Sequence, residues 1–81
     1  MSYGEERLEK ALVNLAELEV RKDKIVKEQL FELAAELRQE FRKVEIEVLE
    51  ARKIIAIENQ EFTEAGYYLD EQTKLKLKLK G

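Results

Sequence analysis

The stretch that decides the fold is VKEQLFELAAELRQEFRKVEIEVLEARKIIAIENQEFTEAG, residues 26–66. Its apolar residues recur at steps of three or four, a spacing that keeps them on one stripe of a helix. No glycine or proline interrupts the stretch before Gly66. The stripe begins at Val26 and continues through Leu30, Leu33, Leu37, Phe41, Val44, Val48, Ala51, Ile55 and Phe62, with Glu58 in its one polar position. The pattern predicts a long amphipathic helix, and from Leu30 to Phe62 the stripe is the expected oligomer interface.

Caps are recognisable at both ends of the helical region. Ser2 is followed three residues later by Glu5, which fits a capping box in which each side chain satisfies an orphan backbone donor. Gly66 fits the left-handed residue that ends a helix in a Schellman cap. We therefore expect the helix to end at Ala65 and residues 1–66 to form one helical oligomerisation domain.

Charged side chains interrupt the apolar stripe at residues 19–24. Either one helix runs through this segment, or a tight turn folds residues 5–20 back against the later helix. Continuity is favoured because no glycine, proline or asparagine marks a turn here. The predicted fold class is therefore all-α: one long helix or a two-helix hairpin. We expect it to form an oligomeric coiled coil or helix bundle, because so long a monomer cannot bury its stripe.

Residues 67–81 are predicted to be a connector and a basic tail in which leucine and lysine alternate. Strict alternation has a period of two, so we expect a short extended segment here. Residues 44–48 also alternate, with glutamate in place of lysine, so strand pairing between these two segments is an alternative to the helix. The candidate contacts for an anionic partner are Lys74, Lys76, Lys78 and Lys80.

Composition argues against most catalytic chemistry. The 81 residues include neither cysteine nor histidine, which excludes disulfides, thiolate nucleophiles, imidazole bases and the usual zinc sites. Glutamates recur four apart at Glu28, Glu32, Glu36 and Glu40, but a carboxylate di-metal site would normally add histidine. We interpret this array as a solvated face. The expectation is a protein that is not an enzyme and has no catalytic residues, metal or cofactor.

The predicted function is protein–protein interaction: a scaffold or adaptor that binds itself, as a homodimer or higher oligomer, or another protein. The alternative is a small nucleic-acid-binding regulator, because residues 1–73 carry 18 acidic and 11 basic side chains whereas the tail is wholly basic. An anionic membrane surface is a third candidate partner for the tail. Charged residues make up 41% of the chain, a composition typical of thermophilic proteins. No targeting signal is visible, so a cytoplasmic location is expected.

Overall fold

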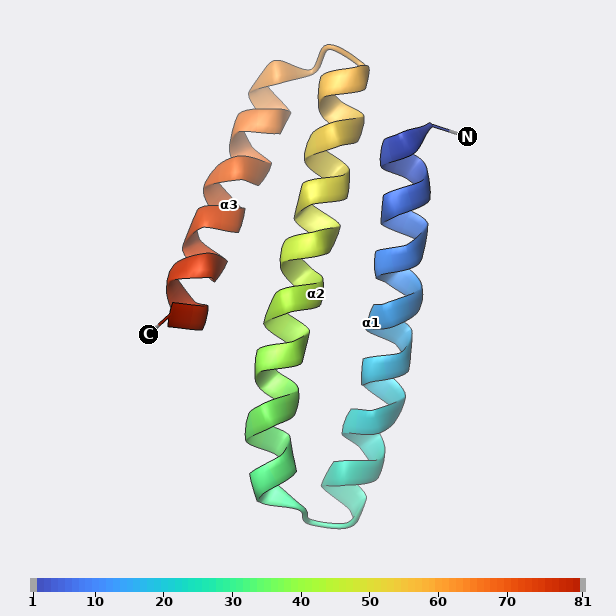
Figure 1. Cartoon of the computed structure of the whole chain (residues 1–81), viewed down its shortest axis with the longest axis vertical. Helices are drawn as coiled ribbons and strands as arrows, with labels where there is room; N and C mark the ends of the chain where they lie inside the picture. Colours follow the sequence, from blue (N-terminus) through green and yellow to red (C-terminus); the bar gives the residue numbers. More distant parts are fainter. Residues whose placement is uncertain (1, 81) are drawn as a thin grey trace.

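The computed structural model describes residues 2–80, without the side chains of Phe31 and Lys80, and consists of three α-helices. These are α1 (Tyr3–Lys27), α2 (Phe31–Glu58) and α3 (Phe62–Lys80). The first two run antiparallel along their lengths, and α3 folds back along the C-terminal half of α2 (Figure 1). The all-α prediction is confirmed, but the described residues form three helices rather than one or two.

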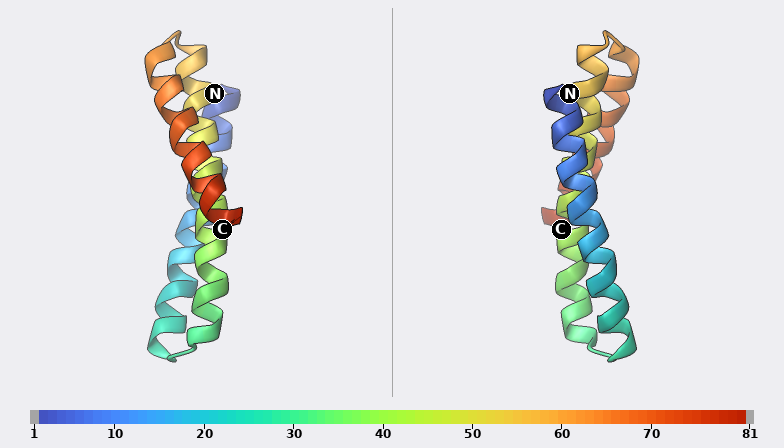
Figure 2. Two further views of the ribbon diagram at one scale, coloured as in Figure 1. Left: turned by 90° about the vertical axis from the view of Figure 1, so that its left-hand side faces the viewer. Right: turned by 90° about the vertical axis from the view of Figure 1, so that its right-hand side faces the viewer.

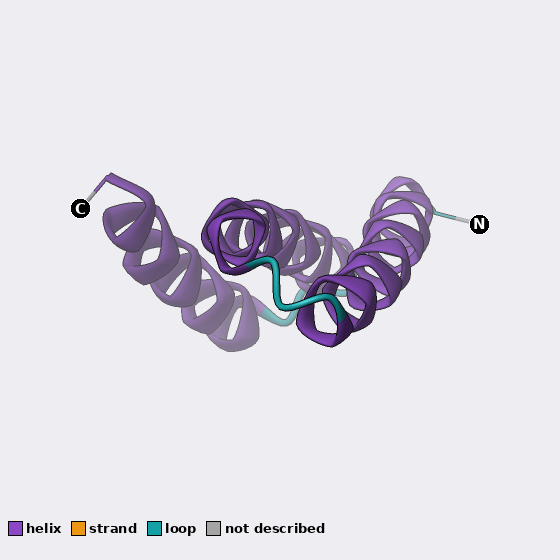
Figure 3. Cartoon of the chain, turned by 90° about the horizontal axis from the view of Figure 1, so that it is seen from below, coloured by secondary structure: helices purple, strands orange, loops and turns teal. Residues whose placement is uncertain are grey.

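The three helices form a single layer. α2 lies in the middle, and within the described part of the chain α1 and α3 pack against it but not against each other. The view along the helices and the two side views show the same open arrangement (Figures 2 and 3). The Cα positions extend over 46 × 30 × 12 Å, and the shortest dimension is close to the diameter of one helix. Both faces of the layer are therefore open along α1 and α2.

The first helix begins at the predicted N-cap, where one of the two hydrogen bonds of the predicted capping box is present. Ser2 is its N-cap, and the Ser2 hydroxyl oxygen accepts a hydrogen bond of 3.1 Å from the backbone N–H of Glu5. Glu5 also lies in the first turn, where the helix dipole favours negative charge. The helix continues without interruption through residues 19–24, so the predicted continuity of that segment is confirmed. The hairpin turn comes later, at residues 28–30.

A Schellman motif closes the end of α1, at a residue that is not glycine. The backbone N–H of Leu30 donates to the carbonyl of Ile25 over 3.1 Å, and that of Gln29 donates to Val26 over 3.2 Å. Gln29 takes the left-handed conformation with a φ of 55°. These are the two hydrogen bonds and the one backbone conformation that define the motif.

The same motif ends α2. The N–H of Glu61 donates to the carbonyl of Ala56 over 2.7 Å, and Gln60 has a φ of 59°. The prediction that Gly66 ends the long helix is therefore wrong: Gly66 lies inside α3, and no glycine among the described residues has a positive φ. The chain turns several residues earlier, at a glutamine that tolerates the left-handed conformation at a cost.

Replacement of Gln60 by glycine should raise the free energy of unfolding by about 0.5–1 kcal/mol, because glycine adopts the left-handed conformation without steric cost. The matched control is Gln39→Gly, which makes the same change at an exposed position inside α2. That variant should lose about 0.5–1 kcal/mol, because glycine disfavours helix interiors. Urea denaturation at one protein concentration measures both, and a loss in both variants would contradict the turn assignment.

The alternating tail is helical and not extended. Residues 74–80 complete α3, where Leu75 and Leu79 are half-buried while the Leu77 side chain is 64% exposed. Leucine and lysine are both strong helix formers, and residues four apart share a helix face, so local propensity prevails over the period of two. The alternative of a strand at residues 44–48 paired with the tail is also wrong, because both segments lie in helices.

The buried apolar core is small. Its apolar residues are Ala11, Leu18, Leu37, Ala51, Ala56 and Ala65. Alanine allows close helix packing but removes little apolar area from water. Among the described residues, Leu18 and Leu37 are the only two large aliphatic side chains in this core. A fold with so small a core leaves many large apolar residues at its surface.

Candidate interaction surface

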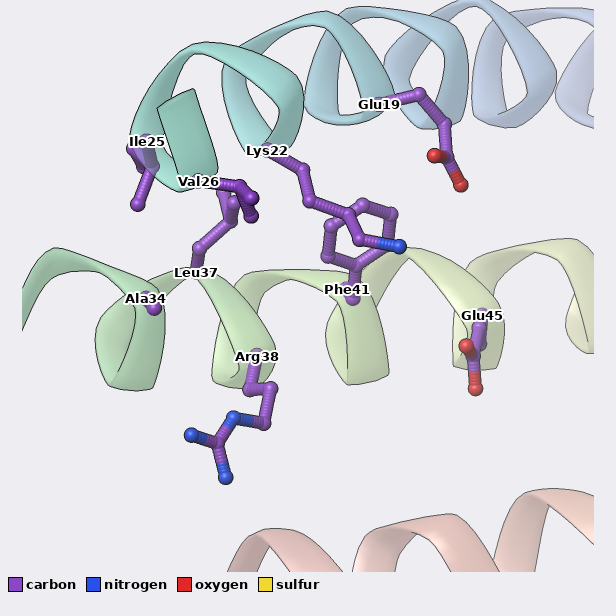
Figure 4. A pocket seen from close by; sticks show the side chains of 9 residues that line it. All are labelled: Glu19, Lys22, Ile25, Val26, Ala34, Leu37, Arg38, Phe41 and Glu45. Atoms are coloured by element: carbon purple, nitrogen blue, oxygen red, sulfur yellow. The ribbon is translucent and has the colours of Figure 1, made fainter. Parts of the chain in front are cut away.

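A hollow lies on one face of the layer, between the C-terminal half of α1 and the N-terminal half of α2 (Figure 4). Its volume is about 440 Å³. It is lined by Glu19, Lys22, Ile25, Val26, Ala34, Leu37, Arg38, Phe41 and Glu45.

Apolar side chains form the centre of this hollow and charged side chains form its edge. Phe41 projects from α2 toward α1, the Lys22 side chain extends over it from α1, and Val26 lies beside Leu37 (Figure 4). Arg38 and Glu45 extend from α2 on the side of α3 (Figure 4). Two acidic and two basic residues line the hollow, so its formal charge is zero. An apolar centre with a charged border resembles the anatomy of protein interfaces.

The apolar flank continues along the hairpin beyond the hollow. Leu12 lies two heptads before Val26, and Val48 lies one heptad after Phe41. A spacing of seven residues keeps side chains on the same flank of a helix. We name the surface formed by Leu12, Val26, Phe41 and Val48 the Phe41 face. Leu12 and Val26 are 42% and 61% exposed, whereas Phe41 and Val48 are half-buried.

Ion pairs join α1 to α2 on the opposite flank of the hairpin. Arg21 Nη1 lies 2.8 Å from Glu40 Oε2, and Arg7 Nη1 lies 3.9 Å from Glu50 Oε1. Arg21 precedes Val26 by five positions, which places the two residues about 140° apart around the helix. These pairs are partly exposed and each adds little stability, but they place paired charges across this flank, which also exposes Leu30 and Leu33 near the turn. The two faces of the α1–α2 hairpin therefore differ in chemistry.

A buried glutamine, Gln72, connects α3 to α2 and was not among the residues predicted from the sequence. The Gln72 side chain is 2% exposed and donates to Glu50 Oε2 over 2.8 Å and to the Ile46 carbonyl over 3.3 Å. Its Oε1 atom is buried without a hydrogen-bond partner in the structure. Gln72 lies in the stripe with Tyr68, Leu75 and Leu79, whose helical spacing is the signal that was available in the sequence.

Glu50 links all three helices. Its carboxylate contacts Lys53 of α2 at 2.8 Å and Gln72 of α3 at 2.8 Å, with Arg7 of α1 nearby. The hydrogen bond from Lys53 lowers the pKa of Glu50 most, followed by that from Gln72, and the charges of Lys53 and Arg7 lower it further against the opposing effect of burial. The ionised form of Glu50 therefore stabilises the packed layer.

Acidification should remove this contribution. Because the pKa of Glu50 in the folded protein lies below its ordinary value of 4.5, its stabilising effect is complete above pH 4.5 and is lost as the pH falls through the folded pKa. The wild type should be more stable than Glu50→Gln at pH 7, and the difference should close on acidification. Thermal melts between pH 7 and pH 3 measure it. Glu47→Gln, which removes the same charge at an exposed position, should show a smaller difference.

The predicted interface residues fall in different environments. Leu37 and Ala51 are buried by the chain's own packing, at 4% and 0% exposure, although Leu37 also lines the hollow. Leu30 and Leu33, beside the hairpin turn, are 40% and 44% exposed. Phe62, at the start of α3, is 66% exposed. The half-buried members are Phe41, Val44, Val48 and Ile55. The predicted stripe therefore serves intramolecular packing in part. Two of its members, Leu37 and Phe41, line the hollow, and Val48 extends its flank.

The predicted lysine cluster is dispersed by the helix. Lys74, Lys76 and Lys78 are exposed, while the side chain of Lys80 lies outside the described part of the chain. Residues two apart on a helix point about 200° apart, so Lys76 does not share a face with Lys74 and Lys78. Lys74 Nζ also lies 3.3 Å from Glu71 Oε1. These lysines do not form the single basic face that an extended tail would present.

Comparison with known proteins gives no relative: no family model, no curated protein and no solved structure matches the chain. Within residues 2–80, no group of three or more acidic residues is arranged to hold a metal ion. None of the three helices is long and apolar enough to cross a membrane. The Phe41 face, with its apolar hollow and charged border, is the candidate functional surface.

Proposed function

We propose that the protein is a non-enzymatic interaction protein, a scaffold or adaptor, that associates with itself. One observation carries this proposal: the isolated chain exposes too much surface for its mass. Its accessible area is 6042 Å² for 9.6 kDa. A compact monomer of that mass exposes about 5,100 Å², so about 900 Å² is in excess.

The size of this excess corresponds to that of an interface. A stable protein–protein interface buries about 800 Å² on each partner. The exposed surface also carries large apolar side chains on every helix, among them Val26, Ile57 and Phe62 at 61%, 47% and 66% exposure. Association is a common source of stability for chains of this length with a small core.

Light scattering over a series of concentrations tests this proposal. We expect a mass of at least twice 9.6 kDa that falls toward the monomer on dilution. Circular dichroism at each concentration should report a mainly helical chain. A stable, helical monomer at every concentration would overturn the proposal of self-association.

The alternative function, nucleic-acid binding through the lysines of α3, stays a prediction. Deletion of residues 74–81 is a poor test because Leu75 and Leu79 help to pack α3 against α2. A triple variant, Lys74→Gln, Lys76→Gln and Lys78→Gln, changes only exposed side chains. An affinity for DNA or RNA that depends steeply on salt and disappears in this variant would support the alternative.

A further inference from the structure

We infer that the partner on the Phe41 face is a second copy of this chain, packed face to face so that α1 and α2 of both copies form a four-helix core. This inference rests on the proposed self-association and adds to it a face and a symmetry.

The two flanks of the hairpin are not equivalent for docking. A helix that packed over the opposite flank would disturb the ion pairs Arg21–Glu40, at 2.8 Å, and Arg7–Glu50, at 3.9 Å. On the Phe41 face, no ion pair between described residues joins α1 to α2. A partner there covers Leu12, Val26 and the hollow without breaking an existing polar contact.

The charges around the hollow favour a second copy over a partner of one charge sign. Glu19 and Lys22 line it on α1, and Arg38 and Glu45 line it on α2. A two-fold axis brings the same patch of both copies together, so the patch must complement itself. A net charge of zero with both signs present satisfies this condition, whereas a strongly acidic or basic partner would be repelled by half of these side chains.

The exposed area is consistent with this geometry. An ordinary interface of about 800 Å² per copy would bring the exposed surface of each chain close to the value for a compact monomer. The layer is 12 Å thick in its shortest dimension. A second layer over one face gives the two-layer packing that small helical domains use to enclose a core.

Two valines of α1 provide a matched test. Val26 is 61% exposed and lines the hollow, whereas Val20 is 70% exposed and lies on the outer side of α1 beside Asp23 and Lys27. We expect Val26→Glu to raise the dissociation constant of the dimer at least tenfold, because a charge is placed in an apolar interface twice. Val20→Glu should leave the dissociation constant unchanged. Circular dichroism checks that both variants remain helical.

Cross-linking supplies a second measurement that does not place a charge in the helix. The chain has no cysteine, so Val26→Cys and Val20→Cys each introduce a unique thiol. A short bis-maleimide should link Val26→Cys into covalent dimers and should leave Val20→Cys largely monomeric on a denaturing gel. Efficient linking of Val20→Cys alone would overturn the inference.

The results separate this inference from the proposed function. If the wild type is a monomer at all concentrations, both fail. If the wild type is a dimer that survives Val26→Glu but is lost in Phe62→Glu, self-association stands and the inferred face is wrong. Phe62 is the appropriate comparison because it is 66% exposed and lies on α3, away from the hollow.

Discussion

Leu37→Ala should lower the free energy of unfolding by about 3 kcal/mol, a large part of the stability of a small domain. Leu37 is 4% exposed, and in the described part of the chain only Leu37 and Leu18 are buried aliphatic side chains larger than alanine. Leu37 lines two hollows. The first, of about 440 Å³, lies on the Phe41 face, and the second, of about 340 Å³, is also lined by Arg21 and Glu40. Truncation of Leu37 would connect them through the layer and admit water to the seam.

The matched control is Leu33→Ala, which truncates the same residue type one turn earlier at 44% exposure. We expect this variant to lose about 1 kcal/mol or less, because its side chain already contacts solvent. Urea denaturation of both variants at equal protein concentration measures the difference, since association would shift the apparent stability of each. Equal losses would show that Leu37 is not a core residue.

The class of the fold could be predicted from the sequence because helical periodicity persists over most of the chain. The cap at Ser2 and the continuity through residues 19–24 could also be predicted, because both depend on the residues in the immediate neighbourhood. The two turns could not. At the first turn, the Schellman hydrogen bond from Leu30 to Ile25 keeps Leu30 beside the last turn of α1. The stripe therefore steps by four residues from Val26 to Leu30, and its spacing shows no break at the turn. Neither turn carries a glycine, since Gln29 and Gln60 take the left-handed positions.

The second turn did leave a signal. Glu58 occupies an apolar position of the stripe and begins a run of four polar residues, 58–61, which is where α2 ends. The sequence prediction placed the end of the helix at Gly66 instead of at this polar run, because glycine is the usual residue at a left-handed helix cap. The candidate surface was less predictable still. Which side of each stripe stays open depends on the arrangement of three helices in one layer, and periodicity alone does not determine that arrangement.

Gly4→Val should lower the free energy of unfolding by about 2–3 kcal/mol, because Gly4 allows α1 to lie close to the end of α2. A Cβ atom at Gly4 would lie 2.8 Å from Ile55 Cγ1, 3.0 Å from Ile54 Cγ2 and 2.7 Å from Glu58 Oε1. The glutamate can rotate away, but the β-branched isoleucines have few alternative rotamers in a helix. The two helices must therefore separate at this end, and thermal or urea denaturation measures the cost.

Gly66→Val is the matched control, and it should raise the free energy of unfolding instead of lowering it. Apart from the neighbouring residues and the backbone of α3 itself, no atom of the described residues lies within 4 Å of a Cβ atom at Gly66, which is an exposed position inside α3. Valine favours the helix slightly more than glycine does, so a gain of a few tenths of a kcal/mol is expected, and Gly66→Ala should gain about 1 kcal/mol. A left-handed cap at Gly66 would instead lose about 1 kcal/mol on substitution by valine. The sign at Gly66 therefore decides whether the chain turns there or continues as α3, independently of the loss at Gly4.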